Sequence, residues 1–123
     1  MQPNKDVAII TGATKGIGRA TAIKFLKNNI NCVLLSRKVD LKFKKYIKSK
    51  FDKDSYIFVQ ADISKINSIK KIINSAIKKF GKINILFNNA AYSDFNQFLK
   101  NDLKKYEKIF NTNVRGLFLL LQA

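Results

Sequence analysis

Histidine is absent from the 123 residues of this sequence, and cysteine occurs once, as Cys32. A chain without histidine cannot use a histidine-based metal site, catalytic triad or proton shuttle. A single cysteine also excludes a disulfide framework and any zinc site built from several thiolates. We therefore expect no metal centre in this chain.

Long hydrophobic runs are absent as well. The longest, Leu117 to Leu121, is far shorter than the roughly 20 residues that a membrane-spanning helix needs. The polar start, Met1 to Asp6, and the short apolar run Val7 to Ile10 do not have the pattern of a secretory signal. We expect a cytoplasmic protein without a membrane partner.

Acidic residues are scarce, with 8 against 24 basic ones and a net charge of +16. Such an excess can indicate a nucleic-acid or anionic-membrane partner. However, 21 of the basic residues are lysines spread along the chain, and asparagine (13) and isoleucine (16) are enriched too, as AT-rich codons would produce. Clustered arginines and an aromatic-rich RNA-binding segment are missing. We favour solvated lysines over a functional basic face and expect no nucleic-acid partner.

Apolar runs and helical patterns alternate along the chain. Short apolar runs predict four buried strands, at residues 7–11, 32–36, 56–60 and 83–87. Helical periodicity predicts four helices, at residues 17–28, 41–51, 66–80 and 102–123. The third helix should start with an N-cap at Ser64 and end at a left-handed Gly81. Its expected apolar stripe consists of Ile66, Ile69, Ile73, Ala76, Ile77 and Phe80.

This alternation predicts a parallel sheet with helices on both faces, in a single domain over residues 1–123. The last predicted helix ends in an apolar stretch without a capping signal. We therefore expect the sequence to represent the first half of a larger fold.

The first predicted strand runs directly into a glycine-rich turn, residues 11–18, before the first predicted helix. Glycines in such a turn let the backbone approach a diphosphate that binds at the helix N-terminus. The spacing G-x-x-x-G-x-G is not that of a P-loop, which would need glycine at Ile17. The turn predicts dinucleotide binding, with a merely tight strand-to-helix turn as the alternative.

The string Thr11-Gly12-x-x-x-Gly16-Ile17-Gly18 resembles the glycine motif of the short-chain dehydrogenase/reductase family. Three later segments resemble the family's motifs in the same order: Asp62-Ile63, Asn88-Asn89-Ala90-Ala91 and Asn113-Val114-Arg115-Gly116. The resemblance covers the whole chain. It implies a Rossmann-like, doubly wound parallel α/β sheet, truncated after about four strands and the following helix. The implied function is the cofactor-binding part of an oxidoreductase similar to ketoacyl reductase-like enzymes.

The expected cofactor-binding residues come from the glycine turn, the end of the second strand and the two middle motifs. They are Thr11, Gly12, Thr14, Lys15, Gly16, Ile17, Gly18, Arg37, Asp62, Ile63, Asn89, Ala90 and Ala91. The resemblance implies that Asp62 and Ile63 contact the adenine.

Two features depart from the family pattern. Ala91 stands where the family has glycine, and its extra methyl is tolerable unless φ at this residue is positive. The family's catalytic Ser and Tyr-x-x-x-Lys would follow Ala123. The pair Tyr46 and Lys50 has that spacing, but it precedes Asp62, so we interpret it as an ordinary helix surface. We therefore expect no turnover by these residues alone.

The end of the second predicted strand, Ser36-Arg37-Lys38, has no carboxylate that could bind the ribose hydroxyls of NAD. Arg37 offers a planar pair of donors for the 2′-phosphate of NADP, and Lys15 adds a second charge. Asp40 lies beyond the strand end, where we expect it to cap the next helix. We expect NADP(H) rather than NAD(H), against the alternative that both cations are simply solvated.

Asn113 lies among apolar residues of the last predicted helix, where a buried amide needs partners and serves as a structural bridge or as part of a site. The resemblance implies a catalytic role, in which Asn113 holds a water in a proton relay. It also implies hydride transfer between NADP(H) and a small-molecule carbonyl or alcohol, in a homo-oligomer paired through this helix. The alternatives are a non-catalytic nucleotide-binding module or inert fragment, and a nucleic-acid binder on the same scaffold. Ketoacyl thioester, steroid, sugar and xenobiotic carbonyls all stay open as substrates.

Overall fold

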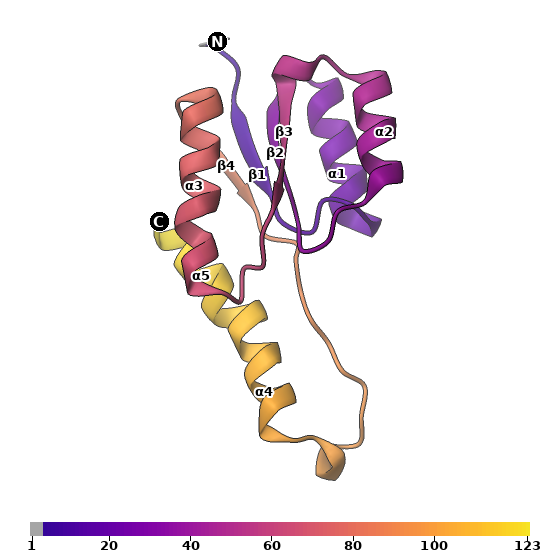
Figure 1. Cartoon of the computed structure of the whole chain (residues 1–123), viewed down its shortest axis with the longest axis vertical. Helices are drawn as coiled ribbons and strands as arrows, with labels where there is room; N and C mark the ends of the chain where they lie inside the picture. The colour runs from indigo at the N-terminus through magenta and orange to yellow at the C-terminus, as the bar shows by residue number, and fades with distance from the viewer. Residues whose placement is uncertain (1–3) are drawn as a thin grey trace.

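The computed structural model describes residues 4–123, which form a parallel sheet flanked by helices (Figure 1). The strands are β1 (Val7–Ile10), β2 (Asn31–Ser36), β3 (Tyr56–Gln60) and β4 (Ile85–Phe87). The α-helices are α1 (Gly16–Lys27), α2 (Leu41–Lys50), α3 (Ile66–Phe80), α4 (Leu103–Phe110) and α5 (Leu117–Gln122). Shorter elements are the 3₁₀ turns η1 (Lys53–Ser55) and η2 (Phe98–Lys100) and the π-helical segment η3 (Asn111–Gly116). The predicted strand at 83–87 is thus shorter than expected, and the predicted last helix is divided by η3.

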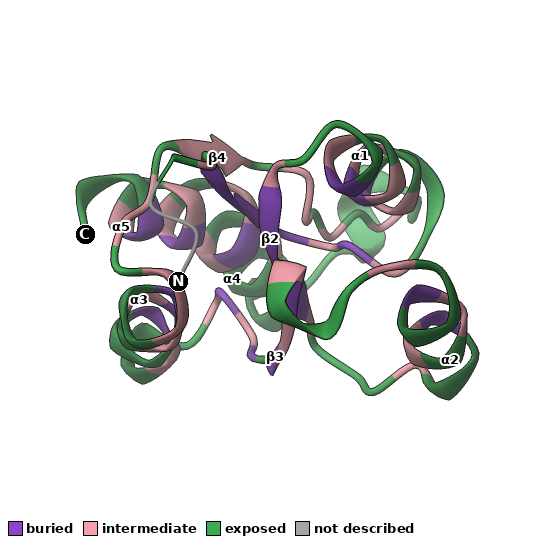
Figure 2. Cartoon of the chain, turned by 90° about the horizontal axis from the view of Figure 1, so that it is seen from above, coloured by how far each residue is buried: buried purple, intermediate pink, exposed green. Residues whose placement is uncertain are grey.

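The strands lie in the order β3-β2-β1-β4, and every neighbouring pair is parallel. Alternate residues of β1 face opposite layers. Val7 and Ile9 pack in a core shared with α3 and α5, whereas Ala8 and Ile10 pack in a core shared with α1 and α2. Because helices cover both faces (Figure 2), every residue of β1 is buried, and all four are apolar. This is the Rossmann-like α/β arrangement that the sequence predicts.

Helix α3 faces the sheet with most, but not all, of the predicted stripe. Its buried residues are Ile69, Ile72 and Ala76, and Ile72, which the predicted stripe omits, is fully buried. Ile66 and Ile77 are instead 59% and 46% exposed. Ile69 and Ala76 of the predicted stripe are buried, and Ile73 and Phe80 pack against the same core. The prediction was wrong in omitting Ile72 and including Ile66 and Ile77, because apolar residues occur at two adjacent helical faces and packing against the sheet selects between them.

The two ends of α3 compare differently with the prediction. Gly81 ends the helix with φ of 77°, the left-handed conformation expected of it. At the start, Lys65 occupies the N-cap position without a side-chain bond. The expected N-cap, Ser64, donates its hydroxyl to Asp62 Oδ1 at 2.7 Å. That prediction was wrong because the helix begins one residue later and the Ser64 side chain is directed to the Asp62 carboxylate.

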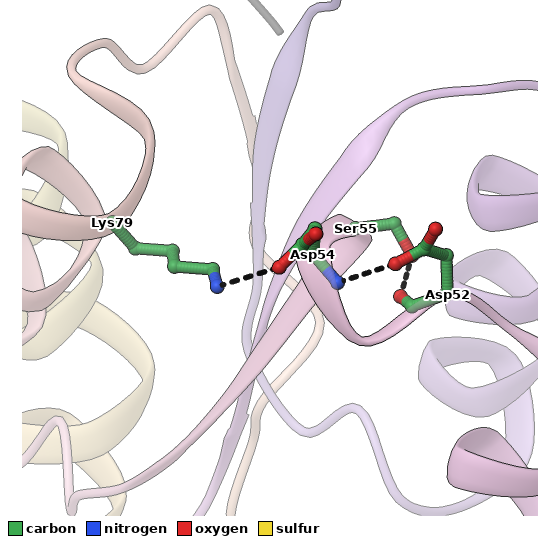
Figure 3. A network of polar contacts seen from close by, with 4 residues as sticks. All are labelled: Asp52, Asp54, Ser55 and Lys79. Atoms are coloured by element: carbon green, nitrogen blue, oxygen red, sulfur yellow. Dashed lines mark hydrogen bonds and ion pairs between the residues drawn. The ribbon is translucent and has the colours of Figure 1, made fainter. Parts of the chain in front are cut away.

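A small polar network stabilises the turn at the amino end of β3 (Figure 3). Asp52 Oδ1 accepts from the backbone N–H of Asp54 at 2.8 Å, and Ser55 Oγ donates to the Asp52 carbonyl at 2.6 Å. Lys79 of α3 lies 3.7 Å from the Asp54 carboxylate. Such an exposed ion pair contributes little stability, so the network mainly fixes the turn itself.

The chain leaves the sheet after β4 and returns only through η3 and α5 (Figure 1). Helix α4 has no buried residue, whereas Leu120 of α5 packs in the core beside α3. In the described sheet β4 pairs with β1 alone and is an edge strand. Within residues 4–123, no helix has both the length and the apolar character needed to cross a bilayer.

Candidate functional site

A cleft of about 690 Å³ opens where β1, β2 and β4 end. Ligands of open parallel sheets bind at this carboxyl edge, because the loops that follow the strands converge there. Four segments line the cleft: the turn after β1, the connection from β2 to α2, the turn after β3 and the loop after β4. The buried Thr112 of η3 completes the lining.

The three glycines in the turn after β1 meet different requirements. Gly12 and Gly16 have φ of +64° and +53°, in the left-handed region that favours glycine. Gly18 packs so closely on the Gly12 carbonyl oxygen that no Cβ fits between them. A Cβ on Gly16 would meet no protein atom within 4 Å. The turn therefore starts α1 with open space beside Gly16, where the N–H groups of a helix N-terminus can bind an anion.

Thr11 joins the turn after β1 to the loop after β4. Its buried hydroxyl oxygen accepts from the backbone N–H groups of Asn89 and Ala90, each at 2.9 Å, and donates to the Phe87 carbonyl at 3.4 Å. The side-chain amide of Asn89 donates in turn to the Gly12 carbonyl at 3.1 Å. These bonds hold two walls of the cleft at a fixed separation.

Positive charge gathers at the end of the cleft beside β2. Arg37, Lys38 and Lys42 line it from the connection between β2 and α2, and Lys15 lines it from the glycine turn. The carboxylate of Asp40 is also in the lining, but its Oδ1 accepts a backbone N–H at 2.9 Å and caps α2, as expected. This end of the cleft therefore carries four cations and one carboxylate, and the carboxylate is already hydrogen-bonded to the backbone. The resulting excess of positive charge can bind a phosphate group.

Asp62 follows β3 between Ala61 and Ile63, which both line the cleft. Asp62 itself lines a neighbouring groove of about 620 Å³. Its Oδ1 accepts from the backbone N–H and the hydroxyl of Ser64, at 2.9 and 2.7 Å. Burial alone would raise the pKa of Asp62, but the bonds from Ser64 and the charges of Arg37 and a nearby lysine outweigh it and lower the pKa. Near neutral pH the residue is therefore an ionised acceptor beside the cleft.

Asn113 holds the loop after β4 against η3. Its Oδ1 accepts from the backbone N–H of Tyr92, and its Nδ2 donates to the Tyr92 carbonyl, both at 2.8 Å. The carbonyl oxygen and the NH₂ group of the side-chain amide are thus both bonded to the backbone of Tyr92. These contacts are those of a structural bridge, and the role in a water relay stays a prediction.

The cleft brings together nine of the thirteen residues expected to bind cofactor, namely Thr11, Gly12, Thr14, Lys15, Arg37, Ile63, Asn89, Ala90 and Ala91. The other four, Gly16, Ile17, Gly18 and Asp62, do not contribute to its lining. Among residues 4–123, Asn29 is the one non-glycine residue with a positive φ. Ala91 therefore satisfies the condition under which its extra methyl is tolerable.

The lining also contains nine residues outside the predicted set, among them Thr112 and Lys42. A polar residue directly before Asn113 in an apolar helix was the available signal for Thr112, whereas Lys42 could not be told from the other lysines of α2.

Tyr46, of the misplaced Tyr-x-x-x-Lys pair, lies outside the lining and packs with its ring centroid 5.2 Å from the Arg19 guanidinium. In the described part of the chain, no three His, Cys, Asp or Glu side chains are grouped so as to hold a metal ion.

Comparison with known proteins agrees with this geometry. The chain is 32% identical over 115 residues to short chain aldehyde dehydrogenase 1 of Euphorbia lathyris, which covers 92% of this chain and 40% of that protein. It is similar to the structure of a 3-ketoacyl-(acyl-carrier-protein) reductase from Brucella melitensis complexed with NADH, with 31% identity and a TM-score of 0.84 over 95% of this chain and 48% of that one. It is also similar to the structure of ElxO with NADP bound, with 31% identity and a TM-score of 0.83 over 96% of this chain and 48% of that one.

The chain thus spans less than half the length of each of these three proteins. The model of the short chain dehydrogenase family matches residues 6–123, which is nearly the whole chain. The protein belongs to the short chain dehydrogenase family.

Proposed function

We propose that the chain binds NADP(H) and forms the cofactor-binding part of an oxidoreductase that transfers hydride between NADP(H) and a small-molecule carbonyl or alcohol. The observation that carries this proposal is the cleft itself. It has the glycine turn, up to the N-cap residue of α1, Lys15, along one wall and a group of cations at the end of β2. A dinucleotide needs both features, because it carries a diphosphate at its centre and, in NADP(H), a further phosphate on the adenosine ribose.

In this proposal the segments in and beside the cleft bind different parts of the dinucleotide. The glycine turn with Gly12 and Gly16 receives the diphosphate at the N-terminus of α1. Asp62 and Ile63 contact the adenine, and the loop after β4 continues along the cofactor. A bound nicotinamide supplies the hydride, and the residues of this chain bind and orient the dinucleotide.

The preference for NADP(H) is supported by the charges beside β2. A similar structure contains NADH and another contains NADP, so similarity favours neither cofactor. In this chain, however, the end of β2 presents Arg37, and the carboxylate of Asp40 is already bonded to the backbone of α2. A guanidinium binds the 2′-phosphate of NADP(H) with paired, charge-assisted hydrogen bonds. The corresponding ribose hydroxyl of NAD(H) carries no charge and can form only a weaker bond with it.

Replacing Arg37 with aspartate tests this preference. A hydrogen bond to a charged group is worth about 1.5–3 kcal/mol, so we expect the parent to bind NADPH about 10- to 100-fold more tightly than NADH. In Arg37→Asp this preference should disappear or reverse, as measured by titrating the fluorescence of each reduced cofactor. Lys48→Asp makes the same change of charge on the exposed side of α2, outside the cleft, and should keep the parental preference. An unchanged NADPH-to-NADH ratio in Arg37→Asp would contradict the proposal.

The same proposal includes a role for Asn113 in holding the water of a proton relay. Since both of its amide groups are bonded to Tyr92, the relay water would lie beside this contact. The proposal also includes a cytoplasmic location and no nucleic-acid partner.

We further propose that the protein is a homo-oligomer that pairs through the last helical segment. Six large apolar residues of this segment are about half exposed or more, and their spacing places them along one side of α4, η3 and α5. They are Leu103, Tyr106, Phe110, Val114, Phe118 and Leu121. Contiguous exposed apolar surface of this kind is typical of a protein–protein contact.

A further inference from the structure

The π-helical segment η3 packs directly against the turn that follows β3. A Cβ on Gly116 would overlap the carbonyl oxygen of Ile63, so the two backbones touch at this point. One residue earlier, Arg115 Nη2 donates to the carbonyl oxygen of Ser64 at 2.7 Å. These two adjacent contacts fix the turn against η3.

Ser64 in turn orients the side chain of Asp62. Its backbone N–H and its hydroxyl both donate to Asp62 Oδ1, at 2.9 and 2.7 Å. Within residues 4–123 no hydrogen bond uses Oδ2 of the same carboxylate. The orientation of the carboxylate is therefore set by Ser64, and Oδ2 is left as the acceptor for an outside donor.

Packing alone does not explain an arginine at position 115. Its Nε is buried and makes no hydrogen bond within the described part of the chain. A buried donor without a partner reduces stability, whereas an apolar side chain of similar length would avoid that loss. The side chain also lines the same groove as Asp62 and Ser64.

We propose that Arg115 is a positioning residue for adenine recognition. By holding Ser64 it fixes Asp62, so that Oδ2 accepts from the 6-amino group of the adenine ring. This inference rests on the proposed dinucleotide-binding function and names the residue that makes binding selective for adenine over a base without that amino group.

The test compares NADPH with its hypoxanthine analogue, in which an oxygen replaces the 6-amino group. Binding is titrated through the fluorescence of the reduced nicotinamide, which both ligands share. Because a hydrogen bond to a carboxylate is worth a factor of about 10 or more, we expect the parent to prefer NADPH by at least about tenfold. In Arg115→Met the preference should fall to within about twofold of equality, and Arg115→Lys, which keeps a donor for Ser64, should restore most of it.

Arg19→Met is the matched control, because it removes one guanidinium that packs on Phe43 and Tyr46 away from the cleft. It should keep the parental preference. Thermal melts of each variant identify a folding defect. If Arg115→Met does not melt cooperatively, Arg115→Leu, which also removes the donor to the Ser64 carbonyl, replaces it with the same expected loss of preference.

Each outcome separates the two claims. A parent that binds neither ligand overturns the proposed function, and the positioning role with it. A parent that binds both ligands equally overturns the role of Asp62 in selecting adenine, and hence that of Arg115. If the parent prefers NADPH and Arg115→Met, or its replacement Arg115→Leu, keeps that preference, only the positioning role is overturned.

Discussion

Neighbouring glycines of the turn after β1 should respond differently to substitution, because they face different surroundings. At Gly18 a side chain would meet the carbonyl oxygen of Gly12, so the cost falls on the packing of α1 against β1. At Gly16 a side chain would enter open space, and only the positive φ of 53° opposes it within the protein. A substitution at Gly16 therefore acts mainly on what binds in that space.

We predict that Gly16→Val abolishes dinucleotide binding while the helical content of the chain stays close to that of the parent. The valine side chain would occupy the diphosphate path, and a β-branched residue in the left-handed region adds local strain of about 1–3 kcal/mol. NADPH titration and far-ultraviolet circular dichroism measure the two quantities. Equal titrations for variant and parent would show that the turn does not bind the diphosphate.

At the scale of one element, α3 offers a comparison within a single helix. We predict that Ile72→Ala lowers the free energy of unfolding by about 2–5 kcal/mol, because Ile72 is fully buried. Ile77→Ala should cost about 1 kcal/mol or less, since Ile77 is 46% exposed and alanine favours the helix. Urea unfolding of both variants measures the difference. A larger loss for Ile77→Ala would contradict this orientation of α3.

Most elements of this fold could be predicted from local pattern, because each strand is a short apolar run and each helix has an apolar side. The details that could not be predicted depend on tertiary contacts. The choice of Ile72 over Ile77 depends on where the sheet lies, and the capture of the Ser64 hydroxyl depends on the conformation of Asp62. The π-helical η3 has no marker in the sequence, since its contacts are with residues far away in the chain.

The candidate site shows the same division. The glycine turn and the Asn89 loop follow strands directly, so their place at the carboxyl edge could be predicted from the order of the elements. The engagement of Asn113 with Tyr92 and the position of Asp62 in the neighbouring groove could not, because both depend on how η3 docks.

At the scale of the whole molecule, we predict that this chain of 123 residues alone does not reduce ketones with NADPH. Hydride transfer to a carbonyl needs a positioned acid, and general acid catalysis contributes about 10²–10⁴-fold. The chain has no histidine, Tyr46 lies outside the cleft, and burial raises the pKa of the Cys32 thiol to about 12. Loss of NADPH absorbance with a panel of ketones measures the activity. Turnover that survives Asn113→Ala and disappears in Tyr46→Phe would contradict this view of the site.

We also predict that the chain self-associates. The apolar side of α4, η3 and α5 is exposed, and β4 is an edge strand that presents unpaired backbone groups. Phe118→Lys should weaken association by at least about tenfold, which corresponds to 1.4 kcal/mol. Sedimentation velocity over a range of concentrations measures the effect. The control is Phe95→Lys, which makes the same change at a phenylalanine that is 96% exposed on the loop after β4. A parent that stays monomeric at every concentration would contradict the pairing.

The bonds that Thr11 makes have a consequence for the order in which this protein acquires its site. The hydroxyl of Thr11 accepts from Asn89, which is 78 residues away in the chain. Contacts between residues so far apart close a large loop and tend to form after the local strand–helix units. A nascent chain that has emerged from the ribosome only as far as α3 carries the complete glycine turn. It lacks the loop after β4, which forms the wall of the cleft that Thr11 binds. During synthesis, the proposed dinucleotide site is therefore complete only after the loop that follows β4 has docked, and a ligand bound there would stabilise that docked state.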